Sequence, residues 1–416
     1  MQEYDVTIIG AGLAGLSAAS FLSKNKDINI LLVEQFKIGE KAGNKIDVVE
    51  VENLERHIRK LEVKPHCTTY DSRWHSPSND QFFLELKNPD CYFLKRGTSE
   101  DSIDSQLIKT ADKQGVKIIL NSKVIDLNSD TRNTTITIST PDGNKKINSK
   151  IIIAADGINS NIAKMSGILK NNNVRMVEGY GIEGGKFNNV EKKIPEVFFN
   201  TKYAPGGYLF IAPSLDGNAT AFCLCDKSKL NNISVKDRFN SFIKKNSILK
   251  EIFLKVKIKN ELFGTGIISG PLKKTTKDNI LLIGNAASVM DPFFAYGVKN
   301  AIITAHLASN VVTKSILENE ISLLNEYEVL LRKELGKSIR LGFFLRQIYD
   351  NLRNKDFDYI ISVLNKLKSN GFEFDEIFDE ISIKRHVPAI TIAALNQPIE
   401  AIKIADLSIK SFLKCI

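Results

Sequence analysis

The first third of the chain alternates between short apolar runs and amphipathic stretches. Residues 4–9 and 28–34 are apolar runs with the length of a buried strand, and residues 13–23 between them carry the small and apolar side chains of a helix. A second amphipathic helix starts near Asp101 and leads into a strand over 115–124. Strands that alternate with helices in this way predict an α/β sheet.

The middle of the chain has a different pattern. Residues 66–94 and 170–270 alternate in strand fashion and are broken by Gly, Pro and Asn, which predicts a second sheet of mixed or antiparallel strands. A hairpin is expected at 141–146, and an apolar strand that ends at Asp156-Gly157 follows it.

The last third returns to helices. An apolar strand over 280–283 is followed by a helix that we expect to open at Gly297-Val298. The spacing of amphipathic helices then continues, most clearly over 321–352 and 399–416. These helices are expected to pack on the core or on a partner helix, and contact with anionic lipid is the alternative.

Length and composition place the chain among ordinary globular proteins. At 416 residues it exceeds one ordinary core, so two or three lobes are expected. The apolar fraction of 43% and the charged fraction of 25% are typical of soluble domains. A net charge of +9 favours anionic partners such as phosphates or acidic lipids, and a solvated lysine-rich surface is the alternative. Because the lysines form no dense block, we expect no nucleic-acid partner.

The five cysteines do not predict a metal site. No second Cys or His pair completes a zinc set. Cys223 and Cys225 lie in one predicted strand, and we expect neighbouring side chains of a strand to face opposite ways, which disfavours a shared metal. The thiols are therefore interpreted as reduced.

From the sequence we expect neither an export signal nor a membrane-spanning segment. Acidic residues precede a very short apolar run at the N-terminus, unlike a signal peptide. No stretch approaches the roughly 18 apolar residues of a membrane-spanning helix. We expect a cytoplasmic protein, with peripheral contact at a membrane surface left open.

A glycine-rich turn near the N-terminus predicts a nucleotide site. Gly10, Gly12 and Gly15 form G-x-G-x-x-G between the first strand and its helix, and Glu34 ends the second strand about 20 residues later. The glycines permit a tight turn, close approach of a pyrophosphate, and close helix packing, while the acid suits a ribose. A second match at 179–185 lacks a following helix, and we interpret it as a glycine-bearing strand.

Four segments in a fixed order carry a family resemblance. They are the glycine fingerprint, the strand that ends at Glu34, Ala-Asp-Gly at 155–157 and Gly-Asn-Ala-Ala at 284–287. Together they resemble the FAD-dependent oxidoreductases of the aromatic-hydroxylase superfamily, most of all its geranylgeranyl reductases. The resemblance covers roughly residues 1–315. It implies an α/β fold with a Rossmann-type FAD-binding domain, a mixed or antiparallel substrate sheet, and a C-terminal helical region.

The resemblance implies FAD as the cofactor and assigns its contacts. Arg96 would reach the ribityl-phosphate region, unless it forms only a surface salt bridge. Val124 would contact the adenine through its backbone, and Asp156-Gly157 would close the nucleotide site, unless they form a plain strand-end turn. The implied cofactor-binding residues are Gly10, Gly12, Leu13, Ala14, Gly15, Glu34, Gln35, Arg96, Val124, Asp156, Gly157, Gly284, Asn285, Asp291, Gly297 and Val298.

One residue departs from the family pattern beside the flavin. Asn285 stands where the family has Asp, so its side-chain carbonyl can still accept a hydrogen bond but brings no charge. The helix that opens at Gly297-Val298 would point its N-terminus at the flavin N1–C2 carbonyl and stabilise the anionic reduced ring. Both features would favour an electron-rich flavin.

The segment PGGYLFIAPSLDG predicts part of a substrate channel. It resembles the Tyr-x-Trp-x-Phe-Pro segment of archaeal-type geranylgeranyl reductases, with Phe210 in place of Trp and Ala212 in place of Phe. Tyr208, Phe210 and Pro213, together with Phe293, are the expected substrate residues, and ordinary strand core is the alternative. The missing tryptophans count against a halogenase.

The most direct functional expectation is reduction of isoprenoid double bonds in a lipid, with hydride from reduced flavin N5. The lipid would be apolar and phosphate-bearing. The alternatives are a monooxygenase that acts through a flavin C4a-hydroperoxide and a non-enzymatic FAD protein. The electron donor stays open between NAD(P)H and a ferredoxin. Gly43-Asn44 replace a Cys-Gly pair of the reductases, so no catalytic residue is assigned.

The resemblance also divides the chain into three parts. The FAD-binding domain is expected to be discontinuous, because the substrate sheet is inserted between its segments. The expected parts are 1–65, 95–165 and 271–315 for the FAD-binding domain, 66–94 and 166–270 for the substrate sheet, and 316–416 for the helical region.

Overall fold

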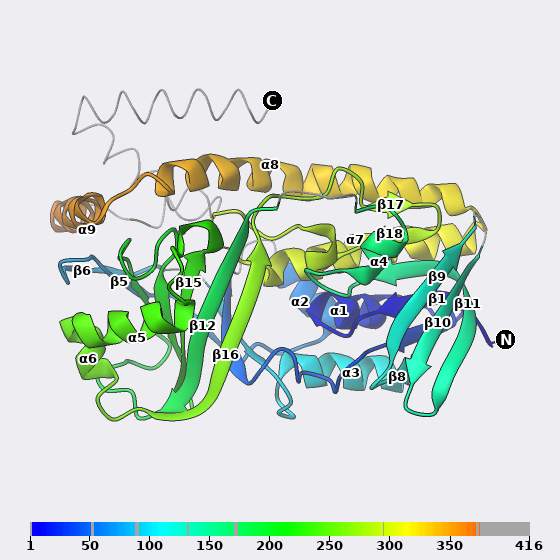
Figure 1. Ribbon diagram of the computed structural model, residues 1–416, viewed down its shortest axis with the longest axis horizontal. Helices are drawn as coiled ribbons and strands as arrows, with labels where there is room; N and C mark the ends of the chain where they lie inside the picture. The colour runs from blue at the N-terminus through cyan, green and yellow to red at the C-terminus, as the bar shows by residue number, and fades with distance from the viewer. Residues whose placement is uncertain are drawn as a thin grey trace.

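The computed structural model describes residues 2–50, 54–87, 91–130, 133–169, 174–293, 295–371 and 374. The chain forms an α/β fold in which two large β-sheets lie side by side, and helix α8 (Glu326–Tyr349) runs across both (Figure 1). The predicted fold class, with a Rossmann-type sheet, a mixed second sheet and C-terminal helices, is confirmed.

The eight-stranded sheet is built around the first strand. β1 pairs in parallel with β2 on one side and with β11 on the other, and β11 pairs in parallel with β18. Residues 6–9 of β1 are buried because helices and neighbouring strands cover both faces of this part of the sheet. Its strands are β1 (Gln2–Ile9), β2 (Ile30–Val33), β8 (Lys117–Ile119), β9 (Lys123–Ser129), β10 (Thr134–Thr140), β11 (Gly143–Ala154), β17 (Thr276–Lys277) and β18 (Ile280–Leu282).

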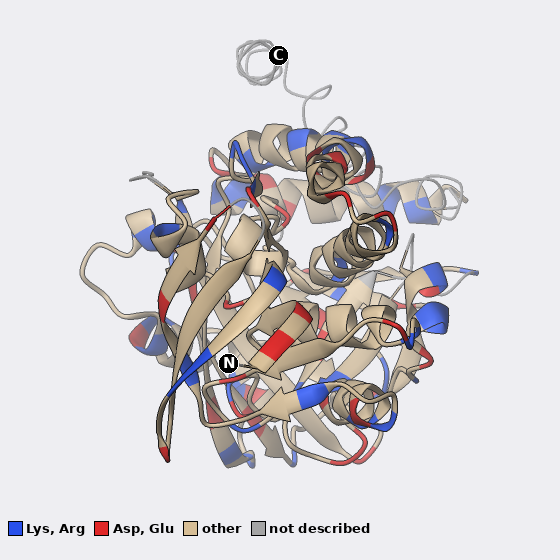
Figure 2. Cartoon of the chain, turned by 90° about the vertical axis from the view of Figure 1, so that its right-hand side faces the viewer, with Lys and Arg blue, Asp and Glu red and all other residues tan. Residues whose placement is uncertain are grey.

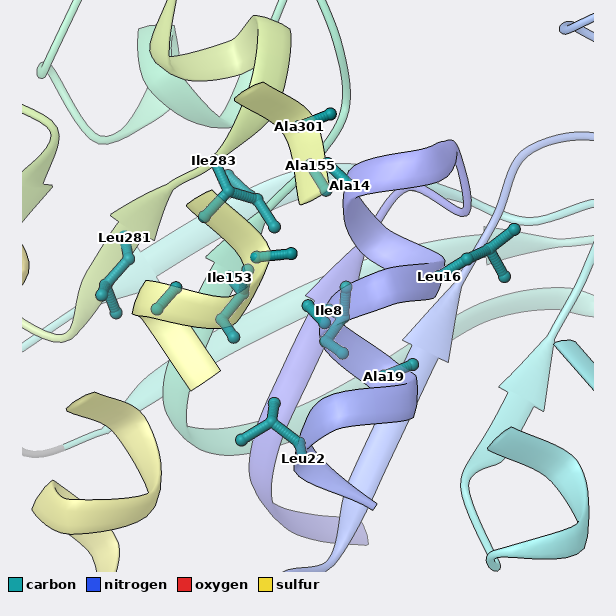
Figure 3. Packing of buried hydrophobic residues seen from close by; sticks show 14 of the residues in the cluster. Ile8, Ala14, Leu16, Ala19, Leu22, Ile153, Ala155, Leu281, Ile283 and Ala301 are labelled. Carbon is teal, nitrogen blue, oxygen red and sulfur yellow. The ribbon is translucent and has the colours of Figure 1, made fainter. Parts of the chain in front are cut away.

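Small side chains let the helices approach this sheet closely. Helix α1 (Leu13–Leu22) packs against α3 (Ile103–Lys113) and α7 (Val298–Leu317). Figure 3 shows Ala14 of α1 close to Ala301 of α7, whereas Leu16 points to the side of α1 that faces away from Ile8 of β1. The main hydrophobic core therefore lies under the glycine turn and holds it in place.

The seven-stranded sheet forms the second half of the molecule. Its strand order is β16-β12-β15-β14-β13-β5-β6, antiparallel except for the β13–β5 pair. Helices α5 (Val235–Lys245) and α6 (Ser247–Ile252) cover one of its faces. Its strands are β5 (Ser72–His75), β6 (Gln81–Leu84), β12 (Met176–Gly185), β13 (Glu196–Phe198), β14 (Leu209–Pro213), β15 (Asn218–Asp226) and β16 (Lys257–Ile267).

The second glycine-rich match lies inside β12, which confirms its interpretation as a strand. Its glycines are needed for packing, because a Cβ at Gly179 or Gly181 would come within 2.1 or 2.7 Å of the Phe222 ring. The ring of Phe222 thus lies flat against bare backbone, and no second nucleotide turn forms.

A small third sheet joins the two large ones, and helices complete the fold. The three strands are β3 (Lys45–Glu50), β4 (Cys67–Thr69) and β7 (Cys91–Arg96). The predicted tail helix over 321–352 is confirmed as α8, while the segment 399–416 lies outside the described residues. The remaining helical elements are α2 (Glu55–Leu61), α4 (Asn161–Met165), α9 (Asn354–Ser369) and the 3-10 turns Lys227–Lys229, Gly284–Ala287 and Ile321–Asn325.

Two local expectations were wrong. The strand expected over 115–124 is split, because a turn with a positive φ of 51° at Asn121 separates β8 from β9. Cys223 and Cys225 are two positions apart, so they face the same side of β15, and their Sγ atoms lie 4.0 Å apart. Both thiols are buried under α5 rather than aimed into a cavity.

Charge is spread over the molecule. In the view of Figure 2, Lys and Arg segments alternate with Asp and Glu segments over the helices and strands. Many of these groups pair across elements, as Lys150 does with Asp5 at 2.8 Å. Among the described residues, we find no helix with the length and apolar character needed to cross a membrane.

Candidate functional site

A cavity of about 1250 Å³ is lined by residues of all three sheets and of helices α7, α8 and α9. Two parts of its wall differ in chemistry. One part consists of backbone turns, acids and lysines around the N-terminal glycines, while the other is apolar and aromatic. The apolar part includes Trp74, Leu84, Phe199, Phe210, Phe222, Met290, Phe357, Ile360 and Ile361.

The glycine turn fits a dinucleotide. A Cβ at Gly15 would lie 1.8 Å from the Gly10 carbonyl oxygen, so only glycine lets α1 pack this closely on the turn. A Cβ at Gly12 would meet nothing within 4 Å, and Gly12 lines the cavity as the residue before α1. The first N–H groups of α1 therefore face open space in which a pyrophosphate can be bound. Leu13 and Ala14 also line the cavity, whereas Gly15 does not.

Glu34 lies at the end of β2, beside the glycine turn. Its carboxylate accepts hydrogen bonds from the Ala11 N–H at 2.5 Å and from the Phe36 N–H at 3.0 Å. These contacts hold the acid at the cavity wall next to Gln35, where it can accept from ribose hydroxyls.

Val124, Asp156 and Gly157 form another part of the wall. The Asp156 carboxylate accepts from the Ser160 hydroxyl at 2.5 Å and from the Ile162 N–H at 3.1 Å, so it also caps α4. Burial raises the pKa of Asp156, although these hydrogen bonds act in the opposite direction. Asp156 therefore forms the strand-end turn and also lies at the cavity wall, so the two alternatives given for it do not exclude each other.

Arg96 lines the cavity, but its guanidinium is bound by two acids. Its Nε and Nη2 donate to both oxygens of Asp104 at 2.8 and 2.9 Å, and its Nη1 donates to Asp47 at 3.0 Å. Burial alone would lower the pKa of Arg96, yet the charge of Asp104, followed by that of Asp47, outweighs this and raises it. Arg96 is a buried ion-pair residue and not the surface salt bridge considered above.

The segment after β18 brings a helix N-terminus to the cavity. Asn285, Gly297 and Val298 line the wall, and α7 begins at Val298 with Gly297 as its N-cap, as predicted. Gly284 does not line the cavity. Its φ is +57°, and a Cβ there would come within 2.8 Å of the Ala14 Cβ, so this glycine serves helix packing.

Asp291 shapes the loop that precedes α7. Its carboxylate accepts from the Phe293 N–H at 3.0 Å, and its N–H donates to the Tyr296 carbonyl at 2.9 Å. Ala295 has a φ of +60°, a strained conformation for a residue other than glycine. Asp291 is thus held beside the cavity rather than on its wall.

Three of the four expected substrate residues lie at the apolar wall. Tyr208, Phe210 and Phe293 line the cavity, while Pro213 ends β14, as predicted, and does not line it. Burial raises the pKa of the Tyr208 phenol well above its ordinary value, and the opposing effect of a hydrogen bond with Tyr296 is smaller. Tyr208 is therefore a neutral hydrogen-bonding group in an apolar wall.

Several wall residues were missed from the sequence. Trp74 and Phe222 come from strands of the seven-stranded sheet, and Phe199 directly follows β13. Tyr349 and Phe357 come from the C-terminal helices. Strand alternation around Phe222 was a usable signal. The helical residues carried none, because core packing and cavity lining produce the same apolar spacing.

The described residues contain no group of three or more His, Cys, Asp or Glu side chains arranged to bind a metal ion. The two close thiols do not form such a group. The hydrogen bond with Cys225, together with burial, raises the pKa of Cys223 well above its ordinary value.

Comparison with known proteins places this geometry in a family. The model of the FAD binding domain family matches residues 3–329. A digeranylgeranylglycerophospholipid reductase of Methanosarcina acetivorans is 27% identical over 390 residues, which cover 90% of this chain and 91% of that protein.

Solved structures have the same fold. A geranylgeranyl bacteriochlorophyll reductase-like protein of Thermoplasma acidophilum has a TM-score of 0.81 at 20% identity, and the match covers 98% of this chain and 100% of that one. The p-nitrophenol 4-monooxygenase of Pseudomonas putida has a TM-score of 0.69 at 13% identity, with 90% and 99% covered. The chain therefore belongs to the FAD binding domain family, and it is an FAD-dependent oxidoreductase similar to the geranylgeranyl reductases.

Proposed function

We propose that the protein reduces isoprenoid double bonds of a phosphate-bearing lipid with its bound FAD. The observation that carries this proposal is the continuity of the cavity, which joins the glycine turn to an apolar wall reaching Ile360 and Ile361 of α9. A polyprenyl chain has only apolar surface to bury, and each buried methylene contributes about 0.8 kcal/mol. A wall of aromatic and branched aliphatic side chains suits such a chain.

The residues assigned to FAD from the sequence keep their proposed roles where they line the cavity. Gly10 and Gly12 would bind the pyrophosphate, Glu34 and Gln35 the ribose, and Val124 the adenine. Asn285 and the N-terminus of α7 would face the isoalloxazine ring. When bound, FAD supplies the hydride that the reduction requires, and the protein supplies binding, orientation and exclusion of water.

Arg96 has a modified role in this proposal. Because Asp104 and Asp47 already accept its hydrogen bonds, Arg96 would support the cofactor wall through β7 and α3 rather than donate to the ribityl phosphate. Gly15, Gly284 and Asp291 would act in the same indirect way, by shaping the turns on which the wall residues lie.

The domain division and the cellular setting also belong to this proposal. We propose that the FAD-binding domain comprises residues 1–65, 95–165 and 271–315, since the eight-stranded sheet draws its strands from these segments. A phosphate-bearing lipid would suit the net charge of +9, and a cytoplasmic protein with peripheral contact at the membrane would have access to it.

The test is anaerobic turnover of the purified protein. FAD-loaded protein reduced by dithionite is mixed with geranylgeranyl lipids, and products are analysed by mass spectrometry. Reduction adds two hydrogens for each double bond, and protein without FAD is the control. A product that gains one oxygen atom, only in air and with NADPH, would identify a monooxygenase. No product with either donor, despite bound FAD, would contradict both functions.

A further inference from the structure

The last turns of helix α8 lie against both sides of the cavity. Gly342 of α8 rests on the loop before α7, because a Cβ there would come within 2.9 Å of the Pro292 Cδ and 3.0 Å of the Asp291 Oδ2. One helical turn further on, Arg346 and Tyr349 contact the two loops that carry Phe293 and Tyr208. Figure 1 shows how α8 reaches both halves of the molecule.

Arg346 joins two backbone segments that are distant in sequence. Its Nη1 donates to the Phe293 carbonyl at 3.3 Å, and its Nη2 donates to the Gly206 carbonyl at 2.5 Å. The side chain is almost fully buried, at 2% exposed. Its charge is balanced by Asp226 at 3.5 Å and Asp350 at 3.4 Å.

Tyr349 reinforces the same connection. Its hydroxyl donates to the Gly207 carbonyl at 2.7 Å, and its ring meets the Phe293 ring edge to face at 5.6 Å between centroids. Gly207 directly precedes Tyr208, so helix α8 contacts the backbone next to Tyr208 and the backbone of Phe293, the two residues that line the cavity here.

The acids around Arg346 keep a second cationic partner. Arg175 pairs with Asp226 and, at 2.6 Å, with Asp350, and Lys229 lies 3.1 Å from Asp350. Removal of Arg346 would therefore not leave either carboxylate without a counter-charge. Charge balance therefore does not explain why Arg346 is present, and its distinctive contacts are the two hydrogen bonds to the loops.

We propose that Arg346 is a positioning residue, a clamp that ties the Phe293 loop and the Gly206-Gly207 loop to one helix and so sets the gap between cofactor and substrate. The proposal rests on the proposed function for the identity of the substrate. The geometry of the clamp can be tested without turnover through Trp74, which is the only tryptophan of the chain and lines the cavity. The Trp74 ring packs edge to face on Phe199, which lies in the same apolar cluster as Phe293 and Tyr349.

The first measurement is the Trp74 fluorescence lifetime in FAD-loaded protein, since quenching by the flavin depends on their separation. We expect a narrow lifetime distribution in the wild type and a broader one in Arg346→Met. Arg346→Lys should be intermediate, because an ammonium cannot bind two carbonyls in the fixed geometry of a guanidinium. Arg340→Met, on the exposed face of the same helix, is the matched control and should resemble the wild type.

The second measurement separates positioning from binding. A displacement of about 1 Å can cost about a hundredfold in rate, so we expect kcat for lipid reduction in Arg346→Met to fall about tenfold to hundredfold. KM and the affinity for FAD should change by no more than about twofold to threefold, because the clamp positions the loops and does not itself bind substrate or cofactor. Unchanged lifetimes together with unchanged kcat would overturn the clamp.

A third variant keeps the test decisive if Arg346→Met does not fold. Tyr349→Phe retains the ring contact with Phe293 and loses only the hydrogen bond to Gly207, so it should broaden the lifetimes to a smaller extent. Wild-type lifetimes and kcat in this variant and in Arg346→Lys together would overturn the proposal. If the wild type reduces no prenyl lipid, the proposed function fails, while the lifetime measurement still decides whether the clamp exists.

Discussion

Two histidines should make the fold sensitive to mild acid. His57 of α2 and His306 of α7 meet edge to face with 4.8 Å between ring centroids, and His57 is only 2% exposed. Burial, followed by the neighbouring positive charges, lowers the pKa of each ring from 6.5 to about 4. Arg56 Nε lies 3.2 Å from His57 Nε2, and Lys60 Nζ lies 3.1 Å from His306 Nε2.

The direction of the pH effect on stability follows from the difference between the pKa of His57 in the folded and in the unfolded state. Because the pKa of His57 in the folded state is depressed, the neutral ring contributes its full stabilisation above pH 6.5, and this is lost as the pH falls toward 4. In this pH window each histidine lowers the free energy of unfolding by about 1.4 kcal/mol for every pH unit that the pH falls. Between pH 6.5 and about pH 5, His57 alone should therefore remove about 2 kcal/mol from the free energy of unfolding.

Urea unfolding of the wild type and of His57→Gln over this pH range tests the reasoning. The difference in free energy of unfolding between the two proteins should shrink by about 2 kcal/mol as the pH falls, because glutamine does not titrate. His66→Gln, outside the cluster, controls for the loss of an imidazole. Parallel stability curves for the wild type and His57→Gln would refute the argument.

Three further substitutions test the cofactor wall. Gly15→Ala places a methyl group 1.8 Å from the Gly10 carbonyl, so FAD should be absent from the purified protein, and a full complement of bound FAD would contradict this packing. Arg96→Met leaves the buried Asp104 without its cationic partner and should lower the free energy of unfolding by about 3–5 kcal/mol, measured in urea. A change below about 1 kcal/mol would exclude a structural ion pair. Asn285→Asp adds a negative charge at the cavity wall and should make the flavin midpoint potential more negative, measured by spectroelectrochemistry, whereas an equal or higher potential would count against a role at the ring.

The sequence predicted local structure well where a short motif is compatible with only one backbone conformation. The glycine turn before α1, the strand ending at Glu34 and the helix opening at Val298 were all predicted, because glycine spacing and apolar runs act over a few residues. The turn at Asn121 was missed because a positive φ at a single asparagine leaves the apolar pattern of the flanking strands unchanged.

The sequence by itself determined the fold class, the family and the cofactor, since these depend on short motifs whose backbone conformation is encoded locally. Only the tertiary structure decided the partners of Arg96, the shared face of the two thiols, and the contribution of α8 and α9 to the cavity. Those features join residues far apart along the chain, as Arg346 joins Gly206 to Phe293. No local pattern records such a contact, because the same buried arginine or apolar helix face would satisfy many packings.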